Sequence, residues 1–210
     1  MRLLDKGKYK SFVRDNNDDE NVIDEVITRQ IYTIEPEWFN GGIIIDIGAN
    51  IGTFCIPNSK YAEVWAFEPN PSTYNVLEAN VGLNKANVKI FNYGFGNSKF
   101  SKINNRGGSS SVIPELKDFF GEPTDREFDC DIKDISELQF GHCNLMKIDC
   151  EGSEYDILEN MPNEMWIKID RMIIEFHPFH NDKRQSYVNE ILNHHYHQVK
   201  RIGNVWYFWN

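Results

Sequence analysis

Carboxylate and imidazole side chains follow two short apolar runs in the second half of this sequence. Asp149 and Glu175 come at the ends of these runs, and Glu151 and His177 lie two residues beyond them. Alternate residues of an extended segment point to the same side, so each pair is expected to face one way. Such a cluster can take the proton from a hydroxyl group as it attacks an electrophile. The four residues are therefore the predicted catalytic group.

The same cluster is also typical of a hard-cation site. Mg²⁺ and Mn²⁺ prefer oxygen ligands, and one imidazole among the ligands does not exclude them. Asp149, Glu175 and His177 would then be the ligands. Direct base catalysis without a metal is the preferred interpretation, because a neutral imidazole accepts a proton near pH 7. The divalent metal stays open as the alternative.

A second group of candidate residues lies around the turn that follows the apolar run Ile43–Ile47. Asp46 is in this run, and Gly48, Asn50 and Gly52 follow it as a Gly-x-Asn-x-Gly turn. Glycine allows a sharp turn and a close approach of the backbone to a ligand. The spacing is neither the Gly-x-Gly-x-x-Gly of dinucleotide sites nor the Gly-Lys-Ser/Thr of triphosphate sites. We therefore expect a different cofactor.

Glu68 ends the next apolar run, about 20 residues after Asp46, where doubly wound sheets place an acid beside a ribose. A carboxylate there accepts hydrogen bonds from both ribose hydroxyls and repels a 2′-phosphate. The expected cofactor is thus an unphosphorylated adenosine compound. Pro69 follows this acid, and Tyr93, at the end of the third run, is expected to border the adenine, with packing in the core as the equal alternative.

Four segments in order resemble the successive blocks of FkbM-type S-adenosylmethionine-dependent methyltransferases: residues 46–52 (DIGANIG), 66–71 (AFEPNP), 147–154 (KIDCEGSE) and 173–178 (IIEFHP). The resemblance extends from about residue 15 to the C-terminus. It implies a class I methyltransferase fold, S-adenosyl-L-methionine as cofactor, and O-methylation of a hydroxyl, often on a sugar or a polyketide. The cofactor would contact Asp46, Gly48, Asn50, Gly52, Glu68, Pro69, Tyr93 and Asp149.

Strands and helices that alternate from residue 43 onward must position these residues. Strands are expected at 43–47, 64–68, 88–92, 145–148 and 172–176, and helices at 50–59, 71–83 and 186–193. Gln198–Ile202 and Val205–Trp209, split by a Gly-Asn pair, predict a hairpin. The prediction is a doubly wound α/β fold with a mostly parallel seven-stranded sheet and a C-terminal antiparallel hairpin. Ligands bind outside the carboxyl ends of such strands.

The 210 residues suit a single methyltransferase domain, with an N-terminal helical cap segment over 1–40 and a Rossmann-like core over 41–210. Apolar residues at helical spacing predict an amphipathic helix over 21–29. Tyr32, just beyond this helix, is expected to close over the cofactor and contact substrate, and ordinary core packing is the equal alternative for it.

The connection from Gly94 to Cys143 is too long for a bare loop in a compact domain. Residues 127–138 predict a strand and a helix within it. Its Gly- and Ser-rich tract, with Ser109 and Ser110, is expected to close over substrate and donate hydrogen bonds to it. His180 is a further expected substrate contact.

The net charge of −10 opposes a nucleic-acid partner, because phosphate binding needs clustered Lys and Arg. The Asn/Asp-Pro-Pro-Tyr/Phe motif of methyltransferases that act on the amino groups of bases is also missing after residue 148. No leader and no apolar run near 20 residues is present, so a cytoplasmic protein without membrane insertion is expected. The four cysteines lack metal-type spacing and are expected to be reduced thiols.

These features predict an S-adenosylmethionine-dependent O-methyltransferase whose acceptor is a hydroxyl, on a sugar in a glycan or a glycosylated small molecule. A cofactor-binding module without turnover and an enzyme acting on a non-carbohydrate hydroxyl, such as a polyketide, are the alternatives. The turn spacing and the hairpin disfavour a nicotinamide oxidoreductase. The pattern specifies no oligomeric state.

Overall fold

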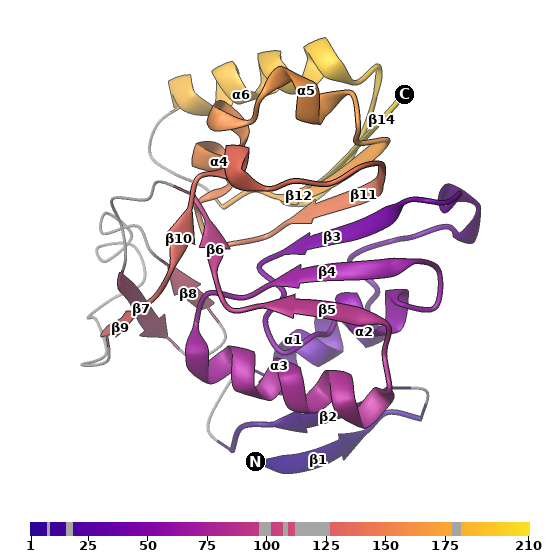
Figure 1. Cartoon of the computed structure of the whole chain (residues 1–210), viewed down its shortest axis with the longest axis vertical. Coiled ribbons are helices and arrows are strands. Elements are labelled where there is room, and N and C mark those ends of the chain that lie inside the picture. The colour runs from indigo at the N-terminus through magenta and orange to yellow at the C-terminus, as the bar shows by residue number, and fades with distance from the viewer. Residues whose placement is uncertain (8, 16–18, 97–101, 107–108, 112–126, 178–181) are drawn as a thin grey trace.

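The computed structural model describes residues 1–7, 9–15, 19–96, 102–106, 109–111, 127–177 and 182–210. Its centre is a seven-stranded sheet with the order β13-β14-β12-β11-β3-β4-β5 (Figure 1). The parallel strands are β3 (Ile43–Ile47), β4 (Glu63–Phe67), β5 (Val88–Phe91), β11 (Cys143–Ile148) and β12 (Arg171–Glu175). The strands β13 (Gln198–Ile202) and β14 (Val205–Trp209) form the antiparallel hairpin at one edge.

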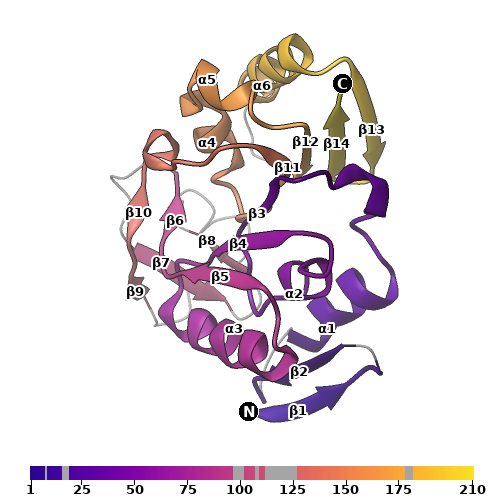
Figure 2. The ribbon, with the colours of Figure 1, turned by 45° about the vertical axis from the view of Figure 1, so that its right-hand side comes forward.

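Neighbouring residues of the central strands alternate between two apolar cores, one on each face of the sheet. On β11, Leu145 belongs to one core, whereas Met146 and Ile148 belong to the other. Burial on both faces is the reason why these strands read as continuous apolar runs. Helices cover both faces of the sheet, those between residues 154 and 195 on one side and those between residues 19 and 84 on the other (Figures 1 and 2). The predicted doubly wound, mostly parallel sheet with its C-terminal hairpin is confirmed.

The predicted helices over 21–29, 50–59, 71–83 and 186–193 differ in length from those observed, and the bounds of the two helices between β11 and β12 were not predicted. The observed helices are α1 (Asp19–Ile23), α2 (Cys55–Asn58), α3 (Pro71–Asn84), α4 (Glu154–Asn160), α5 (Asn163–Trp166) and α6 (Asp182–His195). A π-helical turn over Asp24–Thr28 continues α1. The helix predicted over 50–59 is mostly turn, because Asn50 and Gly52 adopt φ values of 49° and 96°, outside the α-helical region.

The N-terminal segment begins with an antiparallel hairpin that was not predicted, β1 (Arg2–Asp5) and β2 (Lys10–Val13). Asn80 on α3 holds this hairpin against the core. Its side-chain oxygen accepts from the amide of Phe12 at 2.6 Å, and its Nδ2 donates to Ser11 Oγ at 2.9 Å. The cap segment is therefore part strand and part helix.

The long connection between β5 and β11 forms two small sheets. β6 (Gly94–Phe95) pairs in parallel with β10 (Ile132–Lys133). The strands β7 (Lys102–Arg106), β8 (Ser109–Ser111) and β9 (Glu127–Asp129) pair antiparallel, and Figure 1 shows them beside the carboxyl ends of the main sheet. The strand and helix expected at 127–138 are β9, β10 and a 3₁₀ turn at Ile135–Glu137.

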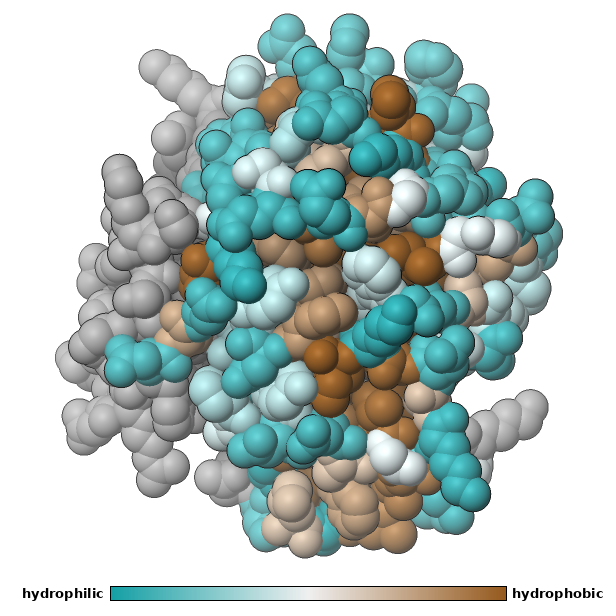
Figure 3. All heavy atoms as spheres, viewed as in Figure 1, coloured by the Kyte–Doolittle hydropathy of each residue, from teal (hydrophilic) through white to brown (hydrophobic). Residues whose placement is uncertain are grey.

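The surface has a mixed character. In the space-filling view, hydrophilic side chains cover much of the visible face, and hydrophobic ones gather near its middle, around the edge strand β5, and at its lower edge (Figure 3). In the part of the chain that the structure describes, no helix has the length and apolar character that a membrane span requires.

Candidate active site

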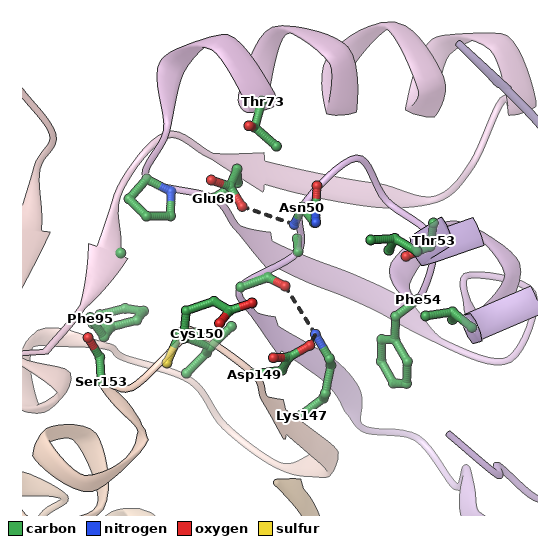
Figure 4. A pocket seen from close by; sticks show the side chains of 18 of the residues that line it. Asn50, Thr53, Phe54, Glu68, Thr73, Phe95, Lys147, Asp149, Cys150 and Ser153 are labelled. Carbon is green, nitrogen blue, oxygen red and sulfur yellow. Dashed lines mark hydrogen bonds and ion pairs between the residues drawn. The ribbon is translucent and has the colours of Figure 1, made fainter. Parts of the chain in front are cut away.

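A pocket opens at the carboxyl ends of β3, β4 and β11 (Figure 4). It lies where ligands bind in open α/β sheets. The predicted site residues that line it are Tyr32, Gly48, Asn50, Glu68, Pro69, Asp149 and Glu151. The N-terminal segment adds Val22 and Val26 to the wall. The predicted cofactor turn and part of the predicted catalytic group thus meet in one cavity.

Gly48 brings the turn after β3 against the turn after β11. Its φ is +81°, and a Cβ atom there would lie 1.8 Å from the carbonyl oxygen of Asp149. No residue with a side chain fits this contact. The amides of Gly48 and Ala49 both donate to the carbonyl of Phe67, each at 3.0 Å, which adds β4 to the same junction.

Glu68 reaches the pocket from the end of β4 with only 7% of its surface exposed. Its Oε2 accepts from the amide of Asn50 and its Oε1 from the amide of Asn70, both at 2.9 Å. Burial raises the pKa of Glu68 to about 7, although these two amides oppose the shift. Each carboxylate oxygen has a second lone pair. Glu68 is therefore fixed in place and can still accept hydrogen bonds from a ligand.

Asp46 and Lys147 form a buried ion pair at the pocket, and Lys147 is part of its wall. Lys147 Nζ lies 3.2 Å from Asp46 Oδ1 and 3.3 Å from Asp149 Oδ2, and it donates to the carbonyl of Gly48 at 3.0 Å. Burial works against the charge, but Asp46 and Asp149 outweigh it and raise the pKa of Lys147. Asp46 is fully buried and does not line the pocket. Asp46 holds the Lys147 ammonium against the turn that follows β3.

Tyr32 connects the N-terminal segment with the catalytic candidates. Its hydroxyl lies 2.8 Å from Asp149 Oδ2 and 2.5 Å from Glu175 Oε2. Its ring meets the ring of Phe54 edge-on, with the centroids 5.6 Å apart. Burial and the two carboxylates raise the pKa of Tyr32 well above its usual value, so the phenol stays neutral.

The two carboxylates beside Tyr32 differ in proton affinity. Burial and the neighbouring Asp149 charge raise the pKa of Glu175. Burial would also raise the pKa of Asp149, but the charges of Lys147 and His177 lower it overall. Environments that separate the pKa values of two acids in this way are typical of acid and base pairs in enzymes. Asp149 is the member that stays ionised.

Carboxylates lie beside both ring nitrogens of His177. Its Nδ1 is 3.0 Å from Glu154 Oε1 and its Nε2 is 3.4 Å from Glu151 Oε2. Burial alone would lower the pKa of His177, but Glu154, Asp149 and Glu151 raise it to about 10. Contrary to the prediction of a neutral imidazole near pH 7, the ring is held as an imidazolium. It can donate hydrogen bonds and stabilise negative charge, whereas Asp149 presents an ionised carboxylate.

Glu154 has a larger part in the cluster than its sequence position indicated. It is fully buried, and its Oε1 accepts from the amides of Cys150 at 2.9 Å and Gly152 at 3.1 Å as well as facing His177. It thus shapes the tight turn after β11, in which Glu151 has φ 52° and Gly152 has φ 112°. The long-range contact of Glu154 with His177 has no local signal in the sequence.

Asp149, Glu154 and His177 offer ligand atoms within 4.8 Å of one another, a different set from the predicted metal ligands Asp149, Glu175 and His177. These residues do not fit a divalent cation well. The Lys147 ammonium lies 3.3 Å from Asp149 Oδ2, where it already supplies the positive charge. The hydroxyl of Tyr32 also occupies that oxygen at 2.8 Å.

The other predicted site residues lie outside the pocket wall. Gly52 is packed so closely that a Cβ atom would come 2.6 Å from Ile56 Cδ1. Tyr93 contacts the rings of Phe67 and Phe95 in tilted and edge-on arrangements and lies under Lys133 Nζ at 3.8 Å, while its neighbours Gly94 and Phe95 line the pocket. Glu175 and His177 lie behind Tyr32 and Glu151.

The structure describes little of the substrate residues that were predicted in the long connection and after the fifth strand. The backbones of Ser109 and Ser110 pair with β7, and their side chains lie outside the described residues. His180 also lies outside them. Sequence reasoning missed several wall residues, namely Thr53, Phe54, Thr73, Ile132 and Ser153. Thr73 lies in the first turn of α3, and the others come from turns and short elements without a periodic pattern.

The sheet order, the C-terminal hairpin and a pocket at the carboxyl ends of the strands define the class I methyltransferase fold. The crystal structure of methyltransferase FkbM from Methylobacillus flagellatus has this fold, with a TM-score of 0.51 and 18% identity, over 87% of this chain and 46% of that one. Residues 46–201 match the methyltransferase FkbM domain, and the chain belongs to this family. The predicted family is confirmed.

Two methyltransferases are similar to this chain in sequence. Methyltransferase sdnD of Sordaria araneosa is 26% identical over 209 residues, which cover 82% of this chain and 80% of sdnD. Hexuronic acid methyltransferase AglP of Haloferax volcanii is 31% identical over 142 residues, which cover 64% of this chain and 56% of AglP.

Proposed function

We propose that this chain is an S-adenosyl-L-methionine-dependent O-methyltransferase that acts on a sugar hydroxyl. The observation that carries the proposal is the placement of two acids in one pocket. Glu68 lies on one side beside Asn50, and Asp149 lies on the other beside Lys147 (Figure 4). One acid is suited to a ribose and the other, which is ionised, to the proton of an acceptor.

The pocket residues fit the cofactor in three parts. Glu68 would accept hydrogen bonds from the ribose hydroxyls, and Phe95 and Ile132 would provide an apolar wall for the adenine. The close approach of Gly48 to the β11 turn leaves backbone, not side chains, beside the ligand. When bound, the cofactor supplies an electrophilic methyl group on a cationic sulfonium, and the acidic side of the pocket suits that charge.

Asp149 would accept the acceptor's proton. It lines the pocket, and its side chain is 24% exposed, so a hydroxyl can reach it. Lys147 keeps it ionised, and the hydroxyl of Tyr32 fixes the direction of Oδ2. A positioned base of this kind contributes roughly 10² to 10⁴ in rate, and the remaining rate enhancement comes from holding the reactants in line.

The choice of a sugar hydroxyl is supported by one relative and by the net charge of the chain. AglP is a hexuronic acid methyltransferase by name. The net charge of −10 disfavours the phosphate backbone of a nucleic acid. A non-carbohydrate hydroxyl, such as one on a polyketide, is the second candidate, since the carboxylate chemistry would serve it equally.

Transfer of a labelled methyl group tests the proposal. The protein would be incubated with radiolabelled S-adenosylmethionine and separate fractions of deproteinised glycans, nucleotide sugars, lipids and nucleic acids. We expect label in a carbohydrate fraction that is stable to mild base, as an ether is, and its loss in the Asp149→Asn variant. Label in the nucleic-acid fraction alone would overturn the proposed acceptor.

A further inference from the structure

Tyr207 on β14 makes two hydrogen bonds with the segment that carries Tyr32. Its hydroxyl donates to the carbonyl of Ile31 at 2.7 Å and accepts from the amide of Thr33 at 3.0 Å. Ile31 and Thr33 are the chain neighbours of Tyr32. One buried side chain therefore fixes the backbone on both sides of this tyrosine.

The backbone around Tyr32 has little regular structure of its own. Residues 29–35 form neither helix nor strand, and Gln30 adopts a left-handed φ of 53°. The ring of Tyr207 belongs to the same apolar core as that of Tyr32 and is 4% exposed. The contact with the central sheet therefore supplies order that the local sequence does not provide.

The hydroxyl of Tyr32, in turn, contacts both acids, Asp149 Oδ2 at 2.8 Å and Glu175 Oε2 at 2.5 Å. These distances permit little movement of the phenol, because a hydrogen bond weakens steeply outside its narrow range. Any shift of the Tyr32 backbone would therefore change the position of Asp149, or release it from this contact.

We propose that Tyr207 is a positioning residue for methyl transfer, which acts through Tyr32 to hold Asp149 and Glu175 in their reactive arrangement. The inference rests on the proposed function, in which Asp149 takes the acceptor's proton. Tyr207 lies beyond the residues matched by the family model and Tyr32 lies before them. The hydroxyl of Tyr207 thus holds the backbone around Tyr32, and the hydroxyl of Tyr32 contacts the two acids.

Removal of single hydroxyl groups tests this arrangement. Tyr207→Phe keeps the ring and deletes both hydrogen bonds to the segment, and Tyr32→Phe deletes both bonds to the acids. Tyr196→Phe is the matched control, because Tyr196 is also buried and donates to the carbonyl of Ile169 at 3.2 Å, and it does not line the pocket. Thermal unfolding of the three variants checks that each is folded.

For Tyr207→Phe we expect kcat to fall about tenfold, since small misplacements of a catalytic group have large effects on rate. The affinity for S-adenosylhomocysteine should stay within about threefold. The double variant should be no more than about twofold slower than Tyr32→Phe, because effects that run through one residue are not additive. A Tyr207→Phe variant as active as Tyr196→Phe, or fully additive losses, would overturn the proposal.

A second measurement does not depend on turnover. The nine tyrosines can be replaced by 3-fluorotyrosine, and the ¹⁹F resonance of Tyr32 assigned from its absence in Tyr32→Phe. Tyr207→Phe should shift or broaden this resonance, and Tyr196→Phe should leave it unchanged. A shifted resonance in a protein that methylates no hydroxyl would support the contact and reject the proposed function. An unchanged resonance would reject the contact itself.

Discussion

The hydroxyl of Tyr32 has one proton to share between two carboxylates. It lies within hydrogen-bonding distance of both Asp149 and Glu175, but a hydroxyl can donate to only one of them and must accept from the other. Burial raises the pKa of Glu175, whereas Lys147 and His177 lower that of Asp149 against the effect of burial. Both shifts make Asp149 the acid that keeps its charge and Glu175 the acid that binds a proton more readily, so we expect Tyr32 to donate to Asp149 and to accept from Glu175 whenever Glu175 is protonated.

Substitution of the two acids should therefore have unequal effects. Asp149→Asn removes the base and should lower kcat by roughly 10² to 10⁴. Glu175→Gln keeps a donor to Tyr32 and should cost less than about tenfold. Single-turnover rates, measured with and without EDTA, check this ranking, and EDTA should not change it because Lys147 supplies the charge beside Asp149. Equal losses in the two variants would show that Glu175 is ionised during the reaction.

Glu68 should give cofactor binding a pH dependence. Because burial raises its pKa to about 7, a large fraction is protonated at pH 6 and ionised at pH 8. The ionised form accepts stronger hydrogen bonds from ribose hydroxyls, so affinity for S-adenosylhomocysteine should rise from pH 6 to pH 8. Glu68→Ala should weaken binding at least tenfold and remove most of this dependence. Calorimetry at both pH values measures it, and unchanged affinity in the variant would exclude Glu68 as the ribose ligand.

The turn after β3 connects the pocket to the central sheet and contacts the turn after β11. Gly48→Ala would place a methyl group 1.8 Å from the Asp149 carbonyl at a φ of +81°, so the two turns must separate. We expect loss of cofactor binding and a destabilisation above about 3 kcal/mol. Gly82→Ala is the control, because it lies in α3 with no atom within 4 Å of the added Cβ.

Gly82→Ala should stabilise the protein by about 0.5 to 1 kcal/mol, since alanine favours the helix. Urea unfolding and calorimetry on both variants make the comparison. Normal cofactor binding by Gly48→Ala would show that the two turns tolerate separation and that their close contact is not what forms the pocket.

The elements that could be predicted are those whose residues carry a local pattern. The five parallel strands and the hairpin were visible as apolar runs, and α3 was visible from Pro71 at its first turn. The helix expected after β3 is mostly a turn, because the φ of Asn50 depends on the junction with β4. The N-terminal hairpin was missed since Asn80, 69 residues further along the chain, holds Ser11.

The residues of the candidate site that could be predicted are likewise those with a local pattern. Glu68 and Asp149 were predicted because each acid stands at the end of an apolar run, and the order of strands then brings them to one edge. The protonated state of His177 was not predictable, since it depends on Glu154 and Glu151 approaching from a different turn. Long-range contacts of single side chains leave no periodic signal in a sequence.

The pocket wall and the residues that support it come from segments far apart in the chain. Val22 and Val26 line it from the N-terminal segment, and Tyr207 on the C-terminal strand holds Tyr32 over the acids. The residues that match the family span only 46–201. Ligand binding should therefore order parts of the chain that lie far apart in sequence.

Hydrogen exchange with and without S-adenosylhomocysteine tests this coupling. At 100 times the dissociation constant the ligand should stabilise the folded protein by about 2.7 kcal/mol. Added protection should appear in residues 19–28 and 48–54, which meet at the pocket, whereas β13 at the far edge of the sheet should show only the global effect. NAD serves as the ligand control. Equal protection by NAD, or protection confined to residues 48–54, would show that the N-terminal segment is not part of the cofactor site.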